Sequence, residues 1–156
     1  MTDTRLSRAA GAGRPAAPVR IAHLGVGNFF RAHQAWYTNQ APDAAEWGIA
    51  AFTGRSAAMA EALTPQDGLY TLITRGQDSD TFEVISSLTA VHPATDHAAW
   101  LGYLASPQLA IVTMTVTEAG YLRGADGGLD TAHPGVVADL AAGSGWVAEY
   151  PREVWQ

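Results

Sequence analysis

Two glycines, Gly25 and Gly27, separate a short apolar segment from a helical pattern, and this order constrains the fold more than any other feature. Residues 19–24 are largely apolar and β-branched, which predicts a buried strand that ends at Gly25. From Asn28 apolar residues recur every three or four positions, which predicts a helix that closes before Pro42. Such a turn lets a phosphate approach the backbone and the helix start, although a plain strand-to-helix connection would use the same residues.

The rest of the chain alternates predicted strands with predicted helices, which indicates an α/β fold. Further strands are expected over 47–53, 69–74, 81–91 and 109–116, and further helices over 56–63, 96–105 and 134–140. The polar stretch 76–80 predicts a hairpin connection, which is an antiparallel excursion from a mostly parallel sheet. We therefore expect a Rossmann-like, doubly wound sheet in which the first and fourth parallel strands are neighbours, so that Gly25 and Thr115 face one crevice.

Composition bounds the domain organisation and the partners. The 156 residues, 47% hydrophobic and 15% charged, suit one globular domain, which we place at 19–142 between a mobile tail over 1–18 and an atypical C-terminal tail over 143–156. A net charge of −6, with nine arginines and no lysine, argues against nucleic-acid binding. No apolar run approaches the ~18 residues of a membrane span and no secretory segment is visible, which predicts a cytoplasmic protein without membrane partners.

Thiol and metal chemistry find no support in the sequence. The chain contains no cysteine, which excludes disulfides, thiolate zinc sites and thiol catalysis. Its five histidines show no ligand spacing, and His23 falls inside the first predicted strand, where a hydrogen-bonded core residue is the expected role. We therefore predict no metal site.

Candidate binding residues follow the first predicted strand. They are Gly25, Val26, Gly27, Asn28 and Phe29, with Arg31 as a cation for the same phosphate. Phe30 stands where the usual dinucleotide fingerprint has a third glycine or alanine, so the motif is degenerate.

Two other strand ends add candidates. After the second strand, where an acidic residue usually holds the ribose of NAD, the sequence has Arg55, which suits a stacked adenine or a 2′-phosphate but also an exposed helix start. At the carboxyl end of the strand 109–116, the residues Thr115, Val116 and Thr117 leave room for a nicotinamide, and the two threonines offer hydroxyls to it. Glu118 is a candidate proton relay there, or a solvent-exposed loop carboxylate.

Four separated segments, in the same order, resemble signatures of the mannitol dehydrogenase family. These are the polyol-specific long-chain dehydrogenases, with fructuronate and tagaturonate reductases as relatives. The segments are 25–35, 66–73, 115–121 and 129–140, and Ala119 stands where the family usually has glycine. The resemblance implies an N-terminal Rossmann-type domain that binds NAD, or NADP, and serves hydride transfer between a secondary alcohol and the nicotinamide without a metal.

The resemblance also raises an expectation about catalysis. The family's catalytic lysine belongs to a helical C-terminal substrate domain, whereas this chain has no lysine and stops at Gln156. We expect that domain to be absent, the chain alone to be inactive, and a sugar alcohol or keto-sugar to bind only when the domain is supplied. The surface left uncovered would be apolar and would favour self-association. The alternative is a structural or interaction remnant of the fold that binds no cofactor.

Overall fold

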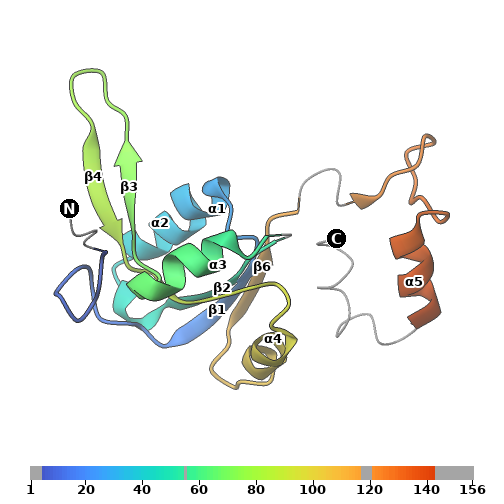
Figure 1. Cartoon of the computed structure of the whole chain (residues 1–156), viewed down its shortest axis with the longest axis horizontal. Helices are drawn as coiled ribbons and strands as arrows, with labels where there is room; N and C mark the ends of the chain where they lie inside the picture. Colours follow the sequence, from blue (N-terminus) through green and yellow to red (C-terminus); the bar gives the residue numbers. More distant parts are fainter. Residues whose placement is uncertain (1–4, 55, 117–120, 143–156) are drawn as a thin grey trace.

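A parallel sheet of four strands forms the centre of the computed structural model, which describes residues 5–54, 56–116 and 121–142 (Figure 1). The strands, in the order in which they lie in the sheet, are β5 (Leu88–His92), β2 (Gly48–Phe52), β1 (Val19–Leu24) and β6 (Ile111–Met114). The pairings β5–β2, β2–β1 and β1–β6 are all parallel. The predicted α/β fold, and the pairing of the first strand with the fourth, are confirmed.

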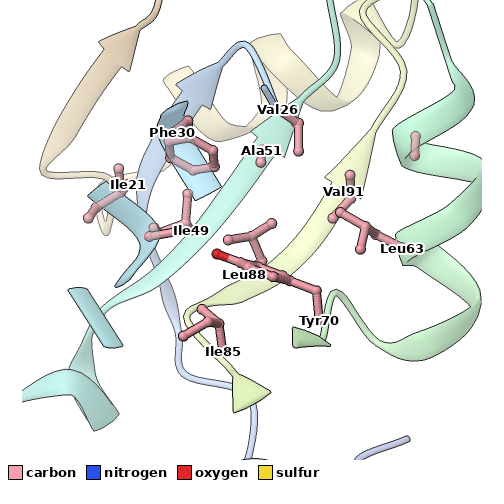
Figure 2. Packing of buried hydrophobic residues seen from close by; sticks show 12 residues of the cluster. Ile21, Val26, Phe30, Ile49, Ala51, Leu63, Tyr70, Ile85, Leu88 and Val91 are labelled. Atoms are coloured by element: carbon pink, nitrogen blue, oxygen red, sulfur yellow. The ribbon is translucent and has the colours of Figure 1, made fainter. Parts of the chain in front are cut away.

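Helices cover both faces of this sheet because its strands alternate their buried side chains. On one face, α1 (Asn28–Ala32), α2 (Gln34–Gln40) and α3 (Ala58–Leu63) cover Ile21 and Ile49. Figure 2 shows this cluster, in which Phe30 of α1 lies over the strands and Leu63 of α3 packs beside Val91. On the other face, α4 (His97–Leu104) places Trp100 against Phe52 with ring centroids 5.0 Å apart.

The antiparallel excursion is shorter than predicted. The sequence predicts one strand over 81–91, but β4 (Thr81–Ile85) pairs with β3 (Tyr70–Thr74) in a separate hairpin, and β5 then joins the main sheet. Ser86 and Ser87 interrupt the strand because the backbone N–H of Ser86 and the hydroxyl of Ser87 form hydrogen bonds with α2. Ser86 N donates to Asn39 Oδ1 at 2.9 Å, and Ser87 Oγ donates to Ala35 O at 2.7 Å. Contacts with α2, distant in sequence, therefore divide the predicted strand.

The helix predicted from Asn28 to Pro42 is also divided. His33 has φ −120° and ψ −85°, outside the helical region, and separates α1 from α2. At this break the Tyr70 hydroxyl, from β3, donates to Arg31 O at 2.6 Å. The hairpin thus satisfies a helix carbonyl that the break leaves available.

The N-terminal residues 5–18 lie against the domain, whereas the sequence predicts a mobile tail over 1–18. Arg8 Nη2 donates to Ser86 O at 2.9 Å and to Leu88 O at 2.8 Å. Arg14 Nη1 and Nη2 donate to Asn39 O and Oδ1 at 2.8 and 2.9 Å. Composition predicts a tail because it cannot reveal these hydrogen bonds, whose acceptors lie far from the arginines in the sequence.

Two further helices follow the prediction. Asp96 caps α4, and its Oδ1 accepts from Ala99 N at 3.1 Å. α5 (Pro134–Ala142) starts at the predicted proline, and Figure 1 shows it set apart from the sheet. None of the described helices combines the length and the apolar character that a membrane crossing requires.

Candidate functional site

A cleft of about 740 Å³ opens at the carboxyl ends of β1, β2 and β6. Its lining residues are Gly25, Val26, Gly27, Asn28, Phe29, Thr53, Gly54, Ser56, Met59, Met114, Thr115, Val116 and Tyr121. From β1 the chain passes to β2 and β5 on one side and returns to β6 on the other, so the direction of winding reverses between β1 and β6. We call this point the β1–β6 crossing; it is the topological switch point of the sheet. Ligands of open parallel sheets bind at such a point, because the two loops that follow the adjacent strands run in opposite directions and separate there.

Gly25 needs to be glycine because of its conformation and its neighbour. Its φ is +112°, and a Cβ there would overlap the hydroxyl of Thr115. Gly25 N donates to Phe52 O at 2.8 Å, and Thr115 Oγ1 donates to Gly25 O at 3.2 Å. The turn is therefore fixed to β2 and β6 at once, and Gly25 and Thr115 face one crevice as the sequence predicts.

Gly27 is open toward the cleft. A Cβ there would meet no described atom within 4 Å, so the missing side chain leaves space and not merely flexibility. Gly27 is the N-cap of α1 and offers no capping side chain. Within the described chain, no group accepts from the backbone N–H of Asn28, Phe29 or Phe30. The turn thus presents backbone N–H groups without an acceptor to the cleft, and this arrangement suits the binding of a phosphate group.

Arg31 lies beside the turn but binds the protein's own groups. Its Nη1 donates to Val26 O at 2.9 Å, and its Nη2 donates to Asn28 Oδ1. The guanidinium therefore braces the loop from the side, and Arg31 is not among the lining residues. Its role as a phosphate cation stays a prediction.

At the end of β2, the described residues of the cleft wall carry no charge. Thr53 is 2% exposed, and its Oγ1 accepts from Ala94 N at 3.1 Å, which ties this wall to the loop after β5. Gly54 and Ser56 also line the cleft, and none of the described lining residues is acidic. Arg55 lies outside the described residues.

At the end of β6, Met114, Thr115 and Val116 line the cleft, whereas Thr117 and Glu118 lie outside the described residues. Sequence reasoning did not name six of the lining residues, which are Thr53, Gly54, Ser56, Met59, Met114 and Tyr121. Tyr121 belongs to the third quoted signature, so a signal for it was present. Thr53, Gly54 and Ser56 flank the predicted residue Arg55, and Met114 directly precedes the predicted Thr115, so a signal for them was also present. Met59 resembles an ordinary core position, and nothing in the sequence pattern distinguishes it.

The histidines hold no metal arrangement: among the described residues, no three His, Asp or Glu side chains lie close enough to share an ion. His33 is exposed, and its Nδ1 lies 2.8 Å from Phe29 O while its ring stacks on Phe29 with centroids 4.3 Å apart. His23 is completely buried and hydrogen-bonded, which confirms the predicted core role.

These features of the fold and the cleft define a Rossmann-type domain. The domain has a twisted parallel sheet with helices on both faces, a glycine turn after its first strand, and a cleft at the β1–β6 crossing. The family model of the mannitol dehydrogenase Rossmann domain matches residues 19–154, and the chain belongs to this family. The match extends past the predicted domain end at residue 142.

Relatives share this domain. The mannitol 2-dehydrogenase of Cereibacter sphaeroides is 38% identical over 127 residues, which are 78% of this chain and 27% of that protein. The D-mannonate oxidoreductase of Escherichia coli (strain K12) is 40% identical over 129 residues, 78% of this chain and 26% of that protein. A solved structure, the Pseudomonas fluorescens mannitol 2-dehydrogenase ternary complex with NAD and D-mannitol, superposes with a TM-score of 0.65 at 35% identity, over 89% of this chain and 27% of that one. The chain thus spans about a quarter of the length of these relatives.

Proposed function

We propose that this chain forms the nicotinamide-dinucleotide-binding domain of a dehydrogenase that acts on polyols or hexuronates. The observation that carries the proposal is the cleft at the β1–β6 crossing, into which the bare backbone at Gly27 opens. Its volume of about 740 Å³ lies within the range of roughly 300–1,000 Å³ that is typical of small-molecule sites. Family membership and the NAD-bound relative support the same ligand class.

The described residues suggest a division of the site. The turn Gly25–Phe29 would hold the pyrophosphate through its N–H groups, and Thr115 with Val116 would line the nicotinamide end. Thr53, Gly54 and Ser56 would border the adenosine end, with Arg55 beside them in sequence. We extend the nicotinamide end to Thr117 and Glu118 as sequence neighbours of that wall.

The described residues at the end of β2 carry no charge, which leaves both NAD and NADP compatible with the site. An acid at that position would repel a 2′-phosphate, and none of the described lining residues is acidic. Both cofactors are therefore to be tested.

When bound, a nicotinamide exchanges a hydride with the carbon of a secondary alcohol or the matching ketone. The hydroxyl proton also needs a base, and the chain offers no lysine for that task. We therefore expect the 156-residue chain alone to form no measurable NADH or NADPH with mannitol, arabinitol, sorbitol or mannonate. Turnover that is abolished by Glu118→Gln would contradict this and identify Glu118 as the base.

We also propose self-association through the edge of the sheet at β6. Ile111, Val112 and Met114 are each more than two-fifths exposed there. Within the described chain, β6 pairs with β1 alone, so its outer edge retains unpaired backbone groups.

Calorimetric titration of NAD⁺, NADH and NADP⁺ into wild type and Gly27→Asp tests the binding proposal. The aspartate suits an N-cap and enters open space, so the urea midpoint should be unchanged or raised. Its charge repels a pyrophosphate, so binding should be lost. The matched variant Gly27→Asn adds the same volume without the charge and should lose less.

Each result decides the proposal. Binding to wild type that Gly27→Asp removes supports a dinucleotide site at the turn. No heat with any of the three ligands would leave a Rossmann fold without cofactor binding. Equal affinity in Gly27→Asp would place the ligand elsewhere.

A further inference from the structure

His23 lies in β1 directly beneath the glycine turn, and it is completely buried. Its ring stacks on Phe30 of α1, with centroids 3.6 Å apart and planes 6° from parallel. Nε2 lies 3.1 Å from Gly25 O, and Nδ1 lies 2.8 Å from Thr113 Oγ1. Desolvation by burial lowers the pKa of His23 to about 4, so the ring is neutral at neutral pH.

The neighbours of the ring determine which nitrogen carries the proton. A carbonyl only accepts, so Nε2 donates to Gly25 O, and in the neutral ring Nδ1 is then the acceptor. The Thr113 hydroxyl must therefore donate to Nδ1. Gln34 Nε2 in turn donates to Thr113 Oγ1 at 2.9 Å. The Thr113 hydroxyl thus accepts one hydrogen bond, from Gln34, and donates another, to His23 Nδ1. Hydrogen bonds thus run in one direction from α2, through β6 and β1, to the turn.

At the turn, these bonds converge on one carbonyl. Gly25 O accepts from His23 Nε2, from Gly27 N at 2.8 Å and from Thr115 Oγ1 at 3.2 Å. Because one of its donors is a completely buried ring, this oxygen is directed into the protein. A carbonyl directed into the cleft would repel phosphate oxygens. Held inward, it leaves the N–H groups after Gly27 as the polar groups that the turn presents.

We propose that His23, aligned by Thr113 and Gln34, is a positioning residue for dinucleotide binding: it holds the Gly25 carbonyl inside the protein and so keeps the turn in its phosphate-accepting form. The inference rests on the proposed function of the cleft and assigns the buried support on which that function depends. A buried polar network in which every member is bonded gives the rigidity that this role requires.

The test replaces Thr113 by valine, which removes the hydroxyl and keeps the shape. NADH affinity is measured by calorimetry and the urea midpoint is measured beside it. We expect Thr113→Val to bind NADH roughly tenfold more weakly, the usual scale for loss of a buried hydrogen bond. Thr89→Val is the matched control, because Thr89 is a strand threonine of the same sheet whose hydroxyl has no partner within the described residues. It should bind NADH as wild type does.

A double-mutant cycle separates positioning from a general loss of structure. His23→Phe keeps an aromatic ring over Phe30 and loses both nitrogens, so adding Thr113→Val to it should weaken binding no further. His23→Gln, which retains an N–H donor, should regain part of the affinity. If His23→Phe does not fold, Gln34→Leu takes its place in the cycle. Wild-type affinity in Thr113→Val, or losses that add in full, would overturn the proposal.

A wild-type chain that binds none of NAD⁺, NADH and NADP⁺ would refute the proposed function, and a ligand-free readout then decides the positioning role. The Gly27 amide donates to the Gly25 carbonyl, so its hydrogen exchange reports whether that carbonyl is held. Exchange at Gly27 should be faster in Thr113→Val than in wild type or Thr89→Val. Equal rates in the three proteins would contradict the role of His23.

Discussion

Gly25 and Gly27 lie two residues apart and are glycines for different physical reasons. Gly25 has a left-handed φ and touches Thr115, so a side chain there is excluded by the protein itself. Gly27 has an ordinary φ of −81° and open space around its Cα, so a side chain there would be excluded only by a ligand. The first glycine serves the fold and the second serves the cleft.

Gly25→Ala should lower the free energy of unfolding by about 1–3 kcal/mol, the scale of a residue held in an unfavourable backbone region. The added methyl also overlaps the Thr115 hydroxyl. Urea denaturation checks this. Gly102→Ala is the control, since an added Cβ at Gly102 in α4 would meet no described atom within 4 Å other than its chain neighbours and the backbone of its own helix. This variant should gain up to about 1 kcal/mol. A Gly25→Ala protein as stable as wild type would be inconsistent with the turn described.

His23 should make the protein less stable in mild acid. Its pKa is about 4 in the folded chain against 6.5 when exposed, so between these values the unfolded chain binds more protons. The contribution of neutral His23 to the free energy of unfolding is complete above pH 6.5 and declines as the pH falls toward 4. Urea denaturation should show about 2 kcal/mol less stability at pH 5 than at pH 7. His23→Gln should remove most of this difference, and an unchanged pH profile would contradict it.

At the scale of elements, the sequence predicts what local pattern determines. The apolar runs of β1, β2 and β6, the glycine turn and the capped α4 are all local, and each is found where expected. The division at Ser86–Ser87 is not local, because its partners are Asn39 and Ala35 of α2. The same limit applies to the site: the turn was predictable from its motif, whereas Met59 reaches the cleft only because α3 folds beside it.

The N-terminal segment should contribute to stability through Arg8. Arg8→Ala leaves the carbonyls of Ser86 and Leu88 without this donor where the hairpin joins the main sheet, and should cost about 1–3 kcal/mol. Arg5→Ala, a change at an exposed arginine of the same segment, should stay within about 0.5 kcal/mol of wild type. Thermal unfolding compares the two. Equal melting temperatures would restore the interpretation of residues 1–18 as a mobile tail.

For the whole molecule, the exposed edge at β6 predicts concentration-dependent association. Neighbouring strand residues point to opposite faces, so exposed Ile111 and Val112 place apolar surface on both sides of this edge. Light scattering over a wide concentration range should show a rising mass, and Val112→Lys should reduce it. Thr71→Lys, on the exposed side of the β3 hairpin, is the charge-matched control. A constant monomer mass would contradict self-association.

The hydrogen bond between Thr115 and Gly25 joins residues 90 positions apart in the chain. During synthesis, β1 is therefore made long before its partner β6, and only β2, with β5 beyond it, can assemble on the other side of β1 in the meantime. Until then its free edge is open to pairing with another chain. Pairing across so many residues is intrinsically slow, so we expect the cleft to be completed late in folding. A nascent chain whose residue 115 is still inside the ribosome would have most of its sheet but an incomplete cleft. A ligand of the cleft would therefore stabilise the chain only after that point.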